Sequence, residues 1–255
     1  MSLSREQVNE FKEKGFIVIK GFFGPDEIAK VSAWLDELRD KSPAEGEEAK
    51  YYETSPISGE NILVRIENVI GDYNREASDL LISDKAREAL TQLFGEAPVL
   101  FKEKVNYKLP GCRADKLHQD QAAGWNAYCD VFITMGIAVD ENRLDNGALS
   151  FMTSGNYEKQ LMTEEWQPLT QDDPPYQPED EYVLLEADPG DVIFFDAYIP
   201  HGSPANTGTR SRRNIFLTFN KESDGDMRET YYRDKWANYA PNQADEARMD
   251  ESFRV

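Results

Sequence analysis

Residues 188–203 read DPGDVIFFDAYIPHGS, and this stretch decides the fold. Pro189 and Gly190 stand at the centre of an Asp-Pro-Gly-Asp sequence, a combination typical of a tight turn. The run 192–195 that follows is wholly apolar, as expected of a strand that crosses a buried core. Beyond it lies His201, one of only two histidines in the chain. The stretch therefore predicts a turn, a buried strand and a candidate metal ligand in close succession.

Strands separated by turns extend on both sides of this stretch, from about residue 98 to residue 220. The predicted strands are 99–108, 129–139, 147–152, 181–187, 190–196 and 213–220, and the Asn146-Gly147 pair between two of them is a strong hairpin signal. The segment before residue 98 is mainly helical, and the segment after 220 is a polar tail. Within the tail, Tyr231, Tyr232 and Trp236 are expected to dock a short helix.

The helical segment carries clear start and stop signals. Ser4 and Gln7 form a capping box for a helix that Gly15 ends, and Gly24-Pro25 begins a second helix. The other predicted elements are a strand at 16–19, a loop at 41–60, a strand at 62–67 and a helix at about 83–94 that Gly95 closes. Helices followed by many short strands predict an α+β fold in which the strands close as a jelly roll. We expect a single domain over 1–255, divided into 1–97, 98–220 and 221–255.

Charge and cysteine content narrow the functional class. The net charge of −20 argues against nucleic acid and anionic membranes as partners, because both reward lysine and arginine. The two cysteines are too few for a disulfide framework and fit a reducing cytoplasm. No apolar run at the N-terminus is long enough for a signal peptide or a membrane span. These features predict a cytoplasmic protein with a small-molecule substrate, and they leave the oligomeric state open.

The other histidine lies two residues before an aspartate, in the sequence His118-Gln119-Asp120. In an extended strand these two side chains point to the same side, so both can reach one ion. With His201 they would supply two imidazoles and one carboxylate, the ligand set of non-haem Fe(II) oxygenases. A surface His–Asp pair is the simpler alternative, and a zinc hydrolase fits poorly because no third histidine exists.

The residues around His201 resemble those of the phytanoyl-CoA dioxygenase family. The shared pattern runs from Gly190 and Asp191 through Asp196, His201, Ser203 and Asn206 to Arg212. The opening Leu3-Ser4-x-Glu6-Gln7-x3-Phe11-x3-Gly15-Phe16 and the segment 105–111 are also similar to that family. This resemblance implies a double-stranded β-helix of the jelly-roll, cupin-like kind with N-terminal helices packed on it. It also implies Fe(II), 2-oxoglutarate and O2 as cofactor and cosubstrates.

The same resemblance implies that Arg212 binds the remote carboxylate of 2-oxoglutarate, with Ser203 as a second donor. Arg210 and Arg213 compete for this role, but strand alternation allows only one of Arg212 and Arg213 to face inward. The other residues assigned here to cosubstrate binding are Asn106, Lys104 and Thr134. His118, Asp120 and His201 are the catalytic residues in this hypothesis, because they hold the iron.

The substrate is expected to be a small anionic or zwitterionic metabolite, such as an amino acid or an aminoalkylphosphonate. This hypothesis rests on the cations Arg65 and Lys102 on predicted inward faces, with Trp125 and Asn126 beside the metal motif. The lysines could instead belong to a solvated strand edge. Because Asp120 is retained, hydroxylation of a C–H bond is favoured over halogenation.

Two other outcomes remain open in the sequence. The same iron centre could carry out desaturation or ring formation, or the chain could be a metal-binding β-barrel without turnover. In addition, residues 153–156 read Thr-Ser-Gly-Asn where the family usually has Pro-Gly-Ser-His, which leaves the substrate contacts at that rim undefined.

Overall fold

A computed structural model describes residues 2–42, 48–153, 159–162 and 182–238. Parts of four sequence predictions lie outside these residues: 43–47 of the loop, 154–156 of the rim segment, the first residue of the strand 181–187, and the tail after residue 238. Among the described residues no helix has the length and apolar character needed to span a membrane.

The helices begin and end where local signals place them. They are α1 (Arg5–Lys14), α2 (Pro25–Asp40), α3 (Arg75–Leu81), α4 (Asp84–Phe94) and α5 (Arg228–Asn238). Ser4 and Gln7 form the predicted capping box of α1, and Gly15 closes it in the left-handed conformation. Gly95 closes α4 in the same way. These cap predictions are confirmed.

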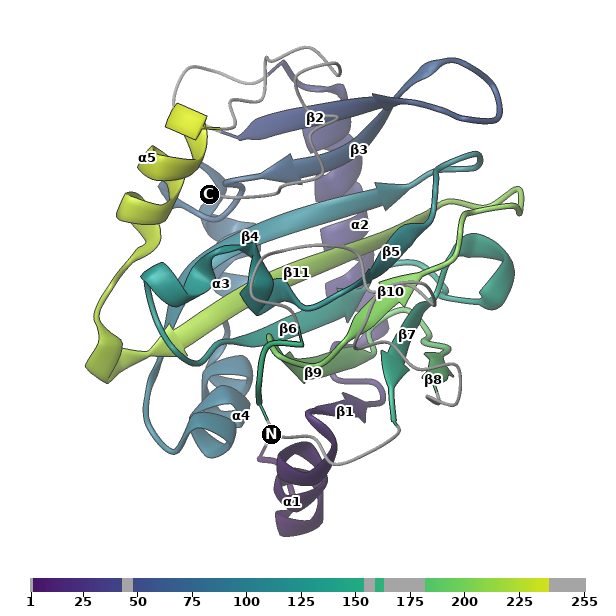
Figure 1. Ribbon diagram of the computed structural model, residues 1–255. Helices are drawn as coiled ribbons and strands as arrows, with labels where there is room; N and C mark the ends of the chain where they lie inside the picture. The colour runs from purple at the N-terminus through teal and green to yellow at the C-terminus, as the bar shows by residue number, and fades with distance from the viewer. Residues whose placement is uncertain (1, 43–47, 154–158, 163–181, 239–255) are drawn as a thin grey trace.

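The strands form two antiparallel sheets that face each other (Figure 1). The seven-stranded sheet has the order β1 (Phe16–Ile19), β9 (Val192–Asp196), β6 (Ile133–Ala138), β11 (Arg212–Lys221), β4 (Pro98–Lys108), β3 (Asn61–Glu67) and β2 (Ala49–Thr54). The four-stranded sheet has the order β5 (Asp115–His118), β10 (His201–Ser203), β7 (Leu149–Met152) and β8 (Tyr182–Leu185). This arrangement confirms the α+β jelly-roll prediction.

Strand β11 shows how the two faces of the large sheet differ. Ile215 and Leu217 point to the outer face, where they join the core formed with α2 and α4. Phe216 points the other way and packs with Phe151 of the smaller sheet. Because side chains alternate along a strand, Arg212 lies on the same inner face as Phe216. Helices α1 to α4 therefore cover one face of the large sheet, and the other face is directed at the smaller sheet.

Three sequence predictions need correction. The loop 41–60 contains β2, in which Ala49 and Tyr51 are buried. The hairpin at Asn146-Gly147 is wrong, because β6 and β7 belong to different sheets and residues 144–146 form a short 3-10 helix instead. The metal motif is only partly extended: β5 ends at His118, and Asp120 begins another 3-10 helix.

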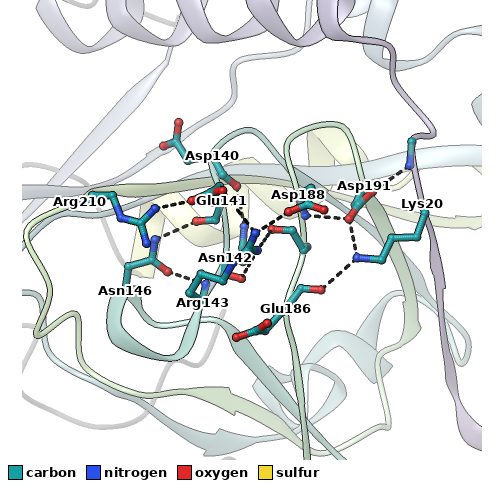
Figure 2. Close-up of polar contacts among 12 residues, drawn as sticks. Lys20, Asp140, Glu141, Asn142, Arg143, Asn146, Glu186, Asp188, Asp191 and Arg210 are labelled. Atoms are coloured by element: carbon teal, nitrogen blue, oxygen red, sulfur yellow. Dashed lines mark hydrogen bonds and ion pairs between the residues drawn. The ribbon is translucent and has the colours of Figure 1, made fainter.

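The turn before β9 ties the N-terminal segment to the barrel (Figure 2). The Asp191 carboxylate accepts hydrogen bonds from the Gly21 amide at 2.8 Å, the Lys20 ammonium at 2.7 Å and the Asp188 amide at 2.7 Å. Gly190 has φ +94°, and a Cβ there would lie 2.2 Å from the Phe23 carbonyl oxygen. The Gly-Asp pair thus serves the close approach of two chain segments rather than the chemistry.

Candidate metal centre and its surroundings

His118, Asp120 and His201 meet at the inner side of the smaller sheet. His118 ends β5 and His201 begins β10, and the two residues are directly paired across the strands. Asp120 is separated from the end of β5 by Gln119 and begins the 3-10 helix formed by residues 120–123. His118 Nε2 lies 3.5 Å from Asp120 Oδ1, and His201 Nε2 lies 3.8 Å from Asp120 Oδ2. The three ligand atoms all lie within 4.8 Å of one another, so they can share one ion.

Both imidazoles are oriented by the backbone. His118 Nδ1 lies 2.7 Å from the Lys116 carbonyl oxygen, and His201 Nδ1 lies 3.0 Å from that of Ile199. A carbonyl oxygen only accepts, so each Nδ1 carries the hydrogen and each Nε2 keeps a lone pair. This tautomer is the one that binds a metal through Nε2, with the ring held by the bond on its other nitrogen.

The electrostatics of the three residues also suit a cation. Burial acts to raise the pKa of Asp120, but Lys104 and the two histidines outweigh it and hold that pKa well below its ordinary range. Burial, together with the neighbouring His118, lowers the pKa of His201 to about 4. An ionised carboxylate and a neutral imidazole are the forms that coordinate a divalent metal. The donor set therefore fits Fe(II), whose facial ligands are two histidines and one carboxylate.

Arg212 lies inside the barrel with unused donors. Its side chain is 1% exposed, and its Nη2 donates to the Gly147 carbonyl oxygen at 2.7 Å. Within the described part of the chain, its Nε and Nη1 have no hydrogen-bond partner. Burial lowers the pKa of Arg212 to about 10, against the attraction of Asp115. A buried guanidinium with two free nitrogens fits a carboxylate ligand.

The two competing arginines are committed elsewhere. Arg213 lies on the outer face, where its Nη2 donates to Asp140 Oδ1 at 2.8 Å and to Ser32 Oγ at 2.7 Å. Arg210 pairs with Glu141 at the surface, as Figure 2 shows. The alternation along β11 thus brings Arg212 alone of the three into the interior.

Ser203 and Lys108 are buried beside Arg212 and share the half-buried carboxylate of Asp115. Ser203 Oγ donates to Asp115 Oδ2 at 2.8 Å and accepts from Lys108, whose Nζ lies 2.9 Å from the same carboxylate oxygen. The sequence patterns do not single out Lys108. It is, however, the last member of an alternating series on β4 with Lys102, Lys104 and Asn106, so the alternation was the available signal.

The remaining cosubstrate candidates lie on the inner face of the large sheet. Asn106 is half-buried opposite Asn214, and Lys104 is half-buried opposite Phe216. Thr134 is buried, and its hydroxyl lies 2.9 Å from that of Thr218. No bound cosubstrate tests these assignments, which stay predictions.

The substrate candidates are placed in two different environments. Lys102 lies over the ring of Trp125, with its Nζ 4.7 Å from the ring centre, and Arg65 pairs with Glu67 at 2.9 Å. Asn126 is exposed on the 3-10 helix 125–127, away from this cluster of contacts. Glu67 also pairs with Lys235, a cation from α5. No motif in the sequence indicates either residue.

Comparisons with known proteins agree with this geometry. A model of the family described as "Phytanoyl-CoA dioxygenase (PhyH)" matches residues 11–214. A 2-aminoethylphosphonate dioxygenase from the uncultured bacterium HF130_AEPn_1 is 36% identical over 251 residues, covering 93% of this chain and 89% of that protein. A methylphosphonate hydroxylase from Gimesia maris is 30% identical over 239 residues, covering 94% and 89%.

Among solved structures, EctD from S. alaskensis with 2-oxoglutarate and 5-hydroxyectoine is similar in fold. Its TM-score is 0.73 at 22% sequence identity, and the match covers 87% of this chain and 77% of EctD. This likeness supports the double-stranded β-helix architecture.

Proposed function

The chain belongs to the phytanoyl-CoA dioxygenase family, and from that premise we propose that it hydroxylates a C–H bond of a small organophosphonate, with or without an amino group. It is a dioxygenase that uses Fe(II), 2-oxoglutarate and O2. The hydroxylase class and the small polar substrate agree with the sequence expectation. What we propose beyond this is that the substrate of this chain is a phosphonate.

The observation that carries the phosphonate proposal is an excess of cations on the inner face near the metal ligands. Lys102 and Lys104 follow one another on that face of β4. Among the residues that the structure describes, neither has a carboxylate within ion-pair distance, although Lys102 is 6% exposed. A buried cation without a counter-ion is unfavourable unless a ligand supplies the negative charge. The names of the two relatives above point to the same kind of ligand.

In this proposal each residue of the centre has one task. His118, Asp120 and His201 would hold Fe(II), and Arg212 would bind the remote carboxylate of 2-oxoglutarate. With O2 as the oxidant, bound iron and 2-oxoglutarate would supply the chemistry that turns a C–H bond into C–OH, in which one oxygen atom of O2 enters the product and the other enters succinate as 2-oxoglutarate loses CO2. Asp120 occupies the position that a halide would need, which favours hydroxylation.

Aromatic side chains shield one side of the centre from water. The ring of Phe151 stacks on His201 with centroids 5.4 Å apart, and Phe195 lies 4.9 Å from the same imidazole. Apolar side chains that exclude water strengthen the ionic contacts of the site and limit oxidative side reactions when no substrate is bound. Desaturation or ring formation on the same iron remains the second candidate. Family membership favours an enzyme over a metal-binding barrel without turnover.

Cytoplasmic location stays part of the proposal. Its support is chemical, because Cys112 and Cys129 are buried free thiols and form no disulfide with each other.

The test is substrate-dependent succinate release by the Fe(II)-loaded enzyme under air. The substrates are 2-aminoethylphosphonate and methylphosphonate, with the sulfonate and carboxylate of matching carbon chain as comparators. We expect succinate with at least one phosphonate and a product one oxygen heavier. Turnover only with sulfonates or carboxylates contradicts the phosphonate proposal, and a product two hydrogens lighter favours desaturation.

A further inference from the structure

Helix α5 brings a lysine into the interior beside the candidate active site. Lys235 is 6% exposed, and its Nζ lies 2.5 Å from Glu67 Oε2 on β3. Glu67 is fully buried and also pairs with Arg65 Nε at 2.9 Å. Lys235 lies beyond residues 11–214, the part of the chain that the family model covers. The family match therefore assigns no role to Lys235.

The position of Lys235 is fixed by several contacts of α5. Figure 1 shows α5 beside the ends of β2, β3 and β4. At its start, Arg228 Nη2 donates to Glu103 Oε1 at 2.9 Å. Near its end, Asp234 accepts a hydrogen bond at 3.0 Å from Tyr128, which follows the metal motif in the chain. Contacts near both ends of α5 therefore fix the helix, one to β4 and one to the segment that follows the metal motif.

Lys235 joins a cationic cluster, which we define as Arg65, Lys102, Lys104 and Lys235 around Glu67. Tyr231 of α5 connects its members: the Nζ atoms of Lys102 and Lys235 lie 5.2 Å and 5.7 Å from its ring centre. Lys235 and Arg65 pair directly with Glu67, and Lys104 is the cross-strand partner of Glu67, in a chain whose net charge is −20. An acidic protein that concentrates cations at one interior position has a local need for an anion.

The lowered pKa values of Lys102 and Lys235 show that burying their ammonium groups is unfavourable. Burial, aided by the Lys235 charge, holds the pKa of Lys102 well below its ordinary value. Burial also lowers the pKa of Lys235 to about 8, although Glu67 opposes the shift. Strongly shifted pKa values of buried groups cluster at functional sites.

The cluster is electrostatically continuous with the metal centre. Lys104 is the largest cationic influence on the Asp120 carboxylate, and it also acts on Lys235. Trp125, whose ring lies under Lys102, follows Asp120 in the same loop. A small molecule held at the cluster would thus be directed toward the iron ligands.

We propose that the cationic cluster binds the phosphonate head group of the substrate, with Lys102 and Lys235 donating to its oxygens. Glu67 is a positioning residue that holds Lys235 and Arg65 side by side. A phosphonate has three acceptor oxygens and up to two negative charges, so it matches several separate donors better than a carboxylate or a sulfonate does. This inference rests on the proposed function and names the residues, including one on α5, that select the head group.

The test is calorimetric binding of methylphosphonate to the Fe(II)–2-oxoglutarate enzyme without oxygen. Lys235→Met and Lys102→Met should each raise the Kd at least tenfold, while the Kd for 2-oxoglutarate stays unchanged. Arg233→Gln is the matched control, because it removes a positive charge from an exposed position on the same helix. Wild-type protein should bind methanesulfonate, which has one charge, at least tenfold more weakly than methylphosphonate.

Stability measurements separate recognition from folding. Lys102 has no carboxylate partner among the described residues, so Lys102→Met should leave the unfolding midpoint unchanged or higher. Lys235→Met leaves Glu67 short of one cation, so the double variant Glu67→Gln/Lys235→Met is tested beside it. Folded variants that bind methylphosphonate as wild type does would overturn the cluster's role.

The two proposals fail in different ways. If wild-type enzyme hydroxylates phosphonates and the lysine variants keep wild-type affinity, the inference is wrong and the function stands. If wild-type enzyme neither binds nor oxidises any phosphonate, the substrate class is wrong, and the inference falls with it.

Discussion

At the scale of single residues, the orientation of the iron ligands is encoded locally. His118 and His201 each donate from Nδ1 to the carbonyl of the residue two positions earlier, Lys116 and Ile199. Each ring is therefore set by its own short stretch of backbone, and the pairing of β5 with β10 then brings the two rings together. The remaining requirement is a carboxylate, which Asp120 supplies.

Removal of one ligand should abolish stable iron binding. His201→Ala leaves one imidazole and one carboxylate, and no other histidine exists to replace it. We expect iron content after gel filtration to fall at least tenfold, as measured by colorimetric iron analysis. Asp130→Asn, which removes an exposed carboxylate near the motif, should keep full iron content. Equal iron content in the two variants would contradict the assignment of the ligands.

The two neighbouring arginines of β11 should separate cosubstrate binding from stability. Arg212→Gln removes the guanidinium proposed for 2-oxoglutarate, and the loss of a buried charge pair is worth about 2–5 kcal/mol. The KM for 2-oxoglutarate should rise by about two orders of magnitude or more, without loss of iron. Arg213→Gln breaks the outer contacts to Asp140 and Ser32, so it should lower the unfolding free energy by about 1–3 kcal/mol and leave that KM unchanged. The reverse pattern would move the role to Arg213.

The residues of the centre differ in how far the sequence could predict them. His118, Asp120 and His201 stand in short spaced motifs. Alternation on the strand allows only one of Arg212 and Arg213 to face inward, and the resemblance to the family favours Arg212. Lys235 has no such pattern, because its role depends on where a C-terminal helix docks. Only the tertiary structure brings it to Glu67, from which it is separated by most of the β-structure.

At the scale of secondary-structure elements, the turn at residues 188–191 fixes the N-terminal segment onto β9. Phe23 donates its amide hydrogen to the Gly190 carbonyl oxygen at 2.9 Å, and Asp191 binds the Gly21 amide at 2.8 Å. Both contacts need the chains to approach closely, which a side chain at position 190 prevents.

Gly190→Ala should therefore be far more damaging than an alanine at another left-handed glycine. At Gly95 a Cβ meets nothing within 4 Å, so Gly95→Ala should cost about 1–2 kcal/mol, the cost of the left-handed conformation itself. At Gly190 the collision with the Phe23 carbonyl adds to this, and we expect about 4 kcal/mol or more. Urea unfolding of the two variants measures the difference. Equal losses would show that the close contact relaxes without penalty.

Capping signals located the helices well, whereas turn signals were less reliable. Ser4, Gly15 and Gly95 act within one turn of their helix, so their effect does not depend on the rest of the fold. The Asn146-Gly147 pair also has the backbone preference for a left-handed glycine, but here Gly147 ends a 3-10 helix between two sheets. A dipeptide specifies a local conformation and not the sheet to which the next strand belongs.

At the scale of the whole molecule, the charge inside the barrel is opposite to the charge of the chain. The inner face of β4 presents Lys102, Lys104 and Lys108, while the net charge is −20. Alternation in the sequence suggested this face for two of them, but their proximity to Arg65 and Glu67 depends on the register of β3 on β4. The single domain over 1–255 stays a prediction, because residues 239–255 lie outside the described structure.

The interior position of Lys235 predicts opposite effects of pH on stability and on activity. Its pKa is about 8 in the folded protein against 10.5 for an ordinary lysine, so between these values the unfolded chain binds more protons. Stability rises with pH wherever the unfolded state binds more protons. The destabilising effect of burying the ammonium is therefore fully present below pH 8 and disappears as pH rises toward 10.5. The charged groups that face Lys235 are Glu67 and Arg65 of β3 and Lys102 and Lys104 of β4, with the phenols of Tyr51 and Tyr231.

Phosphonate turnover should fall over the same interval in which stability increases. The proposed contact needs the protonated lysine, and kcat/KM reports the ionisation of the free enzyme, so kcat/KM for methylphosphonate should decrease as pH rises above about 8. The charge of Lys235 also lowers the pKa of Lys102, so this descending limb of the kcat/KM profile reports the coupled ionisation of both lysines. Lys235→Arg keeps its charge throughout this range and should move the limb to higher pH. The double variant Glu67→Gln/Lys235→Met should lose the rise in unfolding free energy between pH 8 and 10. A descending limb that is identical in Lys235→Arg and wild type would place the titrating group elsewhere.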